Sequence, residues 1–79
     1  MSDNPSRLPR ELHSRVSAGI QVGLWWSPAD GATWVAVRDA RTGAGFVLPI
    51  LAGEQARDVF DHPYAHAARR GVPTTARAA

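Results

Sequence analysis

RVSAGIQVGLWW at residues 15–26 and TWVAVRD at residues 33–39 flank the turn-rich link SPADGA at residues 27–32. In both flanking segments apolar and polar side chains alternate, which is typical of a strand with one buried face. Ser, Pro, Asp and Gly in the link favour a turn. The stretch therefore predicts an antiparallel hairpin whose first strand covers residues 15–26.

One register keeps each face of this hairpin consistent, because a slip by one residue would send the apolar set to the wrong face. It pairs Trp26 with Thr33, Trp25 with Trp34, Leu24 with Val35, Gly23 with Ala36, Val22 with Val37 and Gln21 with Arg38. A second turn at Gly43 returns the chain into residues 46–50, with Phe46 opposite Val37 and Leu48 opposite Val35. Pro49 cannot donate to a ladder, so this third strand is expected at an edge.

Apolar residues recur at helical spacing after the predicted sheet, and the stripe can cover one of its faces. Pro63 interrupts the stripe, which predicts a kink or two short helices that end at Gly71 and Pro73. The expected fold is α+β, a three-stranded antiparallel β-meander with a kinked C-terminal α-helix packed on one face. The expected core is Val22, Leu24, Val35, Val37, Phe46, Leu48, Val59 and Phe60.

The chain has 79 residues, which suffices for one domain and not for two. We expect a flexible leader at residues 1–12, a single βββα domain at 13–71 and a frayed tail at 72–79. No cysteine is present, which excludes disulfides and thiolate metal sites. The early residues lack the apolar centre of a signal peptide, so we expect a soluble, cytoplasmic protein without a membrane segment.

All nine basic residues are arginine, and against seven acidic residues they give a net charge of +2. A GC-rich genome is the simplest source of a chain rich in Arg and Ala, so composition alone is weak support for nucleic-acid binding. Arginines do gather near both ends of the chain, at Arg7, Arg10 and Arg15 and at Arg69, Arg70 and Arg77. This distribution permits contact with a polyanion.

The predicted sheet leaves one face without a cover. The residues expected on it form the candidate binding face: Arg15, Gln21, Trp25, Trp34, Arg38 and Val47. Four covers suit it: the leader or Leu12 folded back, a second copy in a homodimer, another protein, or a nucleic acid. Indole rings and guanidinium groups serve equally in protein interfaces and in base stacking, so residue type leaves these open.

Catalytic patterns are absent from the sequence: it has no Gly-x-Ser-x-Gly elbow and no phosphate-binding glycine loop. His62 and His66 lie four residues apart, near Asp58 and Asp61, and are weak candidates for a metal site. The structural alternative is that Asp61 caps the second helical segment while both histidines pack or face water. We expect no enzyme activity, no cofactor and no small-molecule substrate.

The segment Val59-Phe60-Asp61-His62-Pro63-Tyr64-Ala65 resembles a group of small uncharacterised actinobacterial proteins that end in Val-Phe-x-His-Pro-Tyr-Ala. That resemblance covers residues 13–71 and implies a stand-alone bacterial domain. A meander with Trp34 and Arg38 followed by a helix is also similar in outline to the plant ethylene-response-factor DNA-binding domain. The spacing from Trp34 to Arg38 is one residue shorter than in that family, which places one of the two residues on the other face of the sheet. This second resemblance is therefore an analogy of fold alone.

These observations predict a small non-catalytic binding module that acts through the Trp/Arg face of its sheet, by self-association or with a protein partner. The alternative is a weak nucleic-acid-binding protein that uses the same face and the basic termini.

Overall fold

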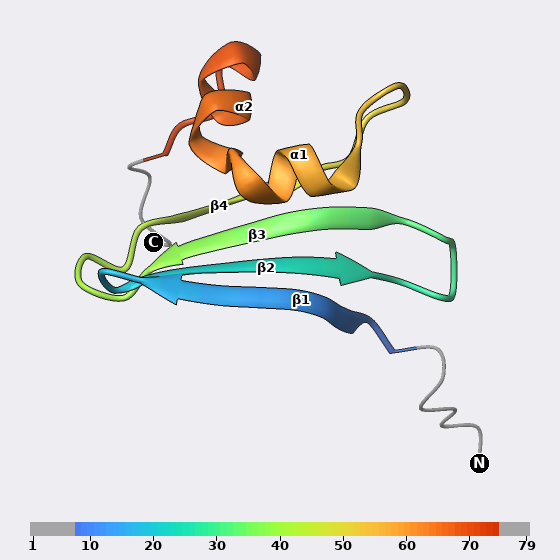
Figure 1. Cartoon of the computed structure of the whole chain (residues 1–79), viewed down its shortest axis with the longest axis horizontal. Coiled ribbons are helices and arrows are strands. Elements are labelled where there is room, and N and C mark those ends of the chain that lie inside the picture. Colours follow the sequence, from blue (N-terminus) through green and yellow to red (C-terminus); the bar gives the residue numbers. More distant parts are fainter. Residues whose placement is uncertain (1–7, 75–79) are drawn as a thin grey trace.

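Four antiparallel strands, paired in the order of the chain, form the sheet of this protein. The structure is a computed structural model, and it describes residues 8–74. The strands are β1 (Arg10–Ser17), β2 (Ile20–Trp26), β3 (Thr33–Asp39) and β4 (Gly45–Pro49), and the helices are α1 (Ala56–Asp61) and α2 (Pro63–Arg70). Both helices lie on one side of the sheet, close to β3 and β4, whereas β1 is the strand farthest from them (Figure 1). The α+β class with an antiparallel sheet and a C-terminal helical region is therefore confirmed.

The number of strands differs from the expected three, because residues 15–26 form two strands rather than one. The chain reverses at Ala18 and Gly19, whose φ angles are 52° and 82°. Two successive positive φ angles are typical of the two-residue type I′ turn that joins twisted antiparallel strands. Ala18 accepts this conformation at a steric cost that Gly19 does not bear. The two-residue apolar period runs from Val16 to Ile20 without a break, so this periodicity gives no sign of the turn.

The predicted register of the other strands is confirmed. Residues Trp26 to Gln21 of β2 pair with Thr33 to Arg38 of β3, and Val37 and Val35 of β3 pair with Phe46 and Leu48 of β4. The new strand β1 pairs with β2, with an irregularity between Glu11 and His13 that leaves Leu12 without a partner. Such a bulge shifts the strand by one residue and increases its local twist.

The helical region divides at Pro63, as predicted. Pro63 is the first residue of α2, where its missing N–H costs no helical hydrogen bond. Gly71 ends α2 in the left-handed conformation (φ 71°), and its amide donates to the carbonyls of Ala67 and Ala68. The result is two short helices, each of which can turn a different face to the sheet.

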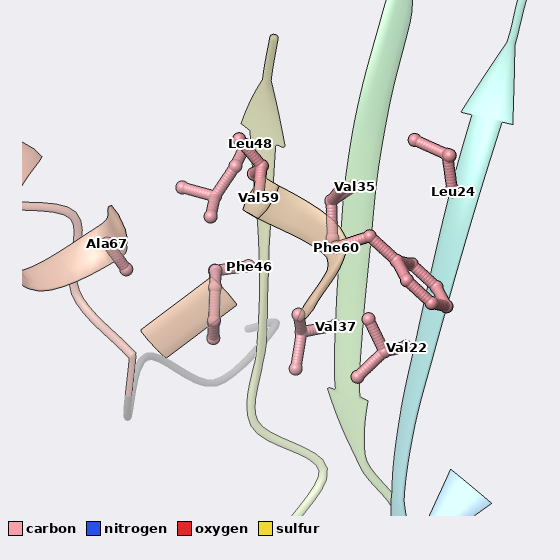
Figure 2. Packing of buried hydrophobic residues seen from close by; sticks show 9 residues of the cluster. All are labelled: Val22, Leu24, Val35, Val37, Phe46, Leu48, Val59, Phe60 and Ala67. Atoms are coloured by element: carbon pink, nitrogen blue, oxygen red, sulfur yellow. The ribbon is translucent and has the colours of Figure 1, made fainter. Parts of the chain in front are cut away.

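The hydrophobic core lies between the helices and one face of β2, β3 and β4. All eight predicted core residues are buried in it, together with Ala67 of α2. Figure 2 shows Val59 close to Leu48 and Val35, and Phe60 reaching towards Leu24 and Val22. Helix α1 thus supplies Val59 and Phe60 to the core between sheet and helices, and α2 supplies Ala67.

The described fold extends beyond the expected domain boundaries at both ends. Residues 10–12, assigned to the leader, lie in β1, and residues 1–7 are outside the described part of the chain. Val72, assigned to the tail, packs partly buried against the core, and residues 75–79 are also outside the described part.

Candidate binding face of the sheet

The face of the sheet that points away from the helices carries three residues from each strand, and we call it the outer face. The strand pairing arranges them in three rows: Glu11, Trp25, Trp34 and Pro49; Ser14, Gly23, Ala36 and Val47; Val16, Gln21, Arg38 and Gly45. Trp25 and Trp34 are half-buried, while Val16 and Val47 are 67% and 54% exposed. Within residues 8–74 no helix or strand covers this face (Figure 1). Its apolar side chains are thus left partly or largely to solvent.

A hollow of about 400 Å³ opens on the β1, β2 and β3 part of this face. The small residues Gly23 and Ala36 form its floor, with Trp25 at one end and Gln21 and Arg38 at the other. Glu11, Ser14 and Val16 of β1 complete the wall. A row of bulky residues therefore lies beside a row of small ones, and the hollow lies over the small row.

Gly23 is needed for this shape. A Cβ atom at this position would lie 2.7 Å from Oε2 of Glu11 and 2.7 Å from Nε1 of Trp25. The indole of Trp25 and the carboxylate of Glu11 therefore both reach over the bare backbone of Gly23. An aromatic side chain laid over a strand glycine covers backbone that would otherwise face water.

Two opposite charges stand on the outer face, Glu11 and Arg38. Both are exposed, and among the described residues neither takes part in an ion pair. Three other arginines are paired: Arg41 with Asp39 at 3.1 Å, Arg57 with Asp61 at 3.3 Å, and Arg70 with Glu54. The outer face is thus mixed in charge, and its exposed arginine is balanced by a carboxylate.

Arg15, which was expected on the binding face, points to the helix side. It pairs with Val22, a core residue, and its Nη2 donates to the carbonyl of Phe60 at 2.7 Å. Its guanidinium also lies 5.2 Å from the centre of the Phe60 ring. The reversal at Ala18 and Gly19 explains the difference, because it exchanges the two faces of β1 relative to a continuous strand. The other five predicted face residues, Gln21, Trp25, Trp34, Arg38 and Val47, do lie together.

The same reversal brings in Glu11, Ser14 and Val16, which the sequence did not place on this face. Gly19 was the available signal, since a glycine inside an alternating run often marks a turn or bulge. Leu12, one of the covers considered for the tryptophans, sits at the bulge and is 48% exposed. A cover by the rest of the leader concerns residues 1–7, which lie outside the described residues.

A second polar cluster surrounds His66 on the helical side. Its Nε2 lies 2.7 Å from Oδ2 of Asp58 and its Nδ1 3.5 Å from Oε2 of Glu54, and its side chain is 7% exposed. Arg70 contacts the same Glu54 and donates to the carbonyl of Pro49 at 2.8 Å. The cluster ties α1, α2 and the loop after β4 to one another.

Both carboxylates of this cluster are stabilised in their charged form. The hydrogen bond with His66 is the main cause that lowers the pKa of Asp58 below its ordinary value. The pKa of Glu54 is lowered chiefly by the amide of Leu51, which donates to Oε1 at 2.9 Å, and then by Arg70 and His66. The described residues around the adjoining hollow are Gly53, Gln55 and Arg69 besides members of the cluster, and they offer no hydroxyl nucleophile to the imidazole. The arrangement is typical of a polar cluster that stabilises the packing of α1, α2 and the loop after β4.

His62, the other weak metal candidate, lies near enough to Asp58 to help lower the pKa of that carboxyl but lines a different hollow from His66. It lines a groove of about 430 Å³ between the β1–β2 turn and the junction of the helices, with Arg15 and Tyr64. The structure therefore does not bring His62 and His66 to one site, and within residues 8–74 no three His, Asp or Glu side chains form a metal-binding group. The expected cap by Asp61 is also wrong, because its carboxylate pairs with Arg57 and no side chain caps α2.

Comparison of the chain with protein-family models, with curated proteins and with solved structures finds no match. The resemblances drawn from the sequence accordingly stay predictions. In the described part of the chain, no helix has the length and apolar character needed to cross a membrane.

Proposed function

We propose that this protein is a non-catalytic binding module, in a bacterial cytoplasm, that recognises another protein surface through the outer face of its sheet. The observation that carries the proposal is the uncovered pair Trp25 and Trp34, flanked by the exposed Val16 and Val47. Tryptophan contributes more than most residues to protein interfaces, because it buries a large area at a small entropic cost. A monomer rarely leaves such a patch to water without a use for it.

The charge distribution favours protein over nucleic acid as the partner. Binding to a polyanion needs several unpaired cations on one surface. Among residues 8–74 the outer face holds one arginine, Arg38, and it shares the hollow with Glu11. Arg15 lies on the helix side and contacts the end of α1. Mixed charges around an apolar centre suit a protein interface better than a phosphate backbone.

Site-specific photo-cross-linking tests the proposal. A benzophenone amino acid replaces Val47 on the outer face in one variant and Ala68, exposed on α2, in a matched control. After irradiation in cells that make the protein, we expect discrete protein adducts from the Val47 position and none from the Ala68 position. Adding Trp34→Ser should remove the adducts. Adducts to nucleic acid, or equal yields from both positions, would contradict the proposal.

A further inference from the structure

We infer that the occupant of the outer face is a second copy of this chain, stacked face to face about a two-fold axis. This inference rests on the proposed function, since it names the partner of the same surface. In a two-fold interface a residue away from the axis meets a different residue of the other copy, and that contact occurs twice. The face must therefore be complementary to itself, and it is so in shape and in charge.

The complementarity in shape comes from adjacent rows. Trp25 bounds one end of the hollow with its indole leaning over Gly23, and Gly23 and Ala36 form the floor. A bulky side chain beside a hollow on the same face allows the same side chain of a second copy to pack into that hollow. Close packing of this kind is what separates a specific interface from a casual contact.

The complementarity in charge comes from Glu11 and Arg38, whose backbone positions lie diagonally opposite each other across the hollow. Glu11 belongs to β1 in the tryptophan row, and Arg38 to β3 in the farthest row from it. Neither has an ion-pair partner among the described residues of its own copy. A two-fold axis between the stacked sheets that exchanges these positions brings Glu11 of each copy to Arg38 of the other. The exposed Glu11 side chain, which lies over Gly23 in the single chain, turns outward to make this pair.

The same axis brings Trp25 of each copy over Ala36 of the other, because the two lie nearly symmetrically about it. It also makes the strands of the two copies cross at a steep angle, which is the orthogonal class of sheet packing. The face offers about a dozen residues per copy, fewer than the roughly 20 to 30 a side of a standard interface. We therefore expect a dimer that dissociates on dilution.

Charge exchange between two variants tests this geometry. Sedimentation equilibrium should show the wild-type mass rising with concentration from 8.5 kDa towards twice that value. Glu11→Arg alone and Arg38→Glu alone place like charges together at both contacts, and each should weaken the dimer at least about tenfold. An equimolar mixture of the two variants restores an opposite-charge pair at both contacts and should dimerise again. Arg69→Glu, which reverses an exposed charge on α2, is the matched control and should leave the dimer unchanged.

Three outcomes overturn the inference. If the wild-type chain stays monomeric at every concentration while the Val47 position cross-links to a different protein, the second copy is excluded and the binding face stands. If dimers form but the mixture associates no better than either variant, the two-fold geometry is wrong. If dimers form and neither the charge variants nor Trp34→Ser affects them, the contact between the copies lies elsewhere. If the Val47 position then also gives no cross-linked adducts, the proposed function is refuted as well. Circular dichroism melts establish that each variant is folded.

Discussion

Phe60→Ala is the substitution to which this fold should be most sensitive. Phe60 is 7% exposed and belongs to α1, which packs against β2 and β3. Its ring reaches towards Leu24 and Val22 (Figure 2) and lies beneath the guanidinium of Arg15. Truncation therefore removes core packing and, at the same time, the surface on which β1 is held to the helical layer.

The expected cost is about 3 to 5 kcal/mol, the usual range for a buried phenylalanine replaced by alanine. A core of this size rarely supplies more than roughly 3 to 5 kcal/mol of net stability. The two values are of the same size, so the alanine variant should be largely unfolded at 25 °C. Phe60→Leu keeps most of the volume and should cost less than about 1.5 kcal/mol, which leaves a folded protein to measure.

Urea unfolding followed by tryptophan fluorescence gives the free energy for Phe60→Leu, because Trp25 and Trp34 change environment when the sheet opens. For Phe60→Ala the emission without urea shows how much of the chain is already unfolded. Tyr64→Ala is the control: Tyr64 makes an edge-to-face contact with Phe46 at 5.2 Å but is 41% exposed, and its loss should cost only about 1 kcal/mol. Equal midpoints for Phe60→Ala and the wild-type chain would refute the packing of α1 on the sheet. A larger loss from Tyr64→Ala than from Phe60→Ala would also refute it.

The remaining predictions concern the outer face and the histidine cluster. Trp25→Ser combined with Trp34→Ser should leave the chain folded by circular dichroism and abolish association in sedimentation, since interface tryptophans often contribute 2 kcal/mol or more; global unfolding would show that the face is covered internally. In titrations with duplex and single-stranded oligonucleotides at low salt we expect weak binding at most, and Arg38→Ser should lower the log-log salt slope by about one if any binding is seen; tight, sequence-selective binding would overturn the preference for protein. Because the hydrogen bond with His66 lowers the folded pKa of Asp58, this pair contributes stability above about pH 4 that is lost as the pH falls through the lowered value. Asp58→Asn should therefore flatten the acid limb of the urea midpoint against pH, and an unchanged limb would assign the acid sensitivity to other groups.

The register and the core were predictable because both depend on alternation of period two. Alternation excludes a slip by one residue, and the length of the turn between Ser27 and Ala32 then selects Leu24 opposite Val35. The strand count was not predictable by the same argument, since the turn at Ala18 and Gly19 preserves the alternation. A turn built on Asn-Gly would have been recognised, whereas an alanine with φ of 52° gives no signal and leaves Gly19 as the single indication.

The candidate face was predictable where it lies on β2, β3 and β4, and not where it lies on β1. Arg15 and Val16 exchange faces when one long strand becomes two. The sequence therefore predicted a positive charge on the β1 part of the outer face, where the structure places the negative charge of Glu11. The helical side shows a similar limit. The predicted stripe contained Tyr64 and Ala67 but not His66; in the structure Ala67 and His66 are buried, whereas Tyr64 is 41% exposed.

The contact between Arg15 and the Phe60 carbonyl has a consequence for the dynamics of β1. Every residue of β1 is exposed, so this strand depends on its ladder with β2 and on that long-range hydrogen bond. Strands with few buried contacts open at a lower free energy than the whole domain, and their amide protons exchange sooner. Glu11 and Val16 leave the outer face whenever β1 detaches, so the complete surface exists only in the closed state. A ligand that touches them binds the closed state alone and shifts the equilibrium towards it, so docking of the strand and recognition of the partner become linked in free energy.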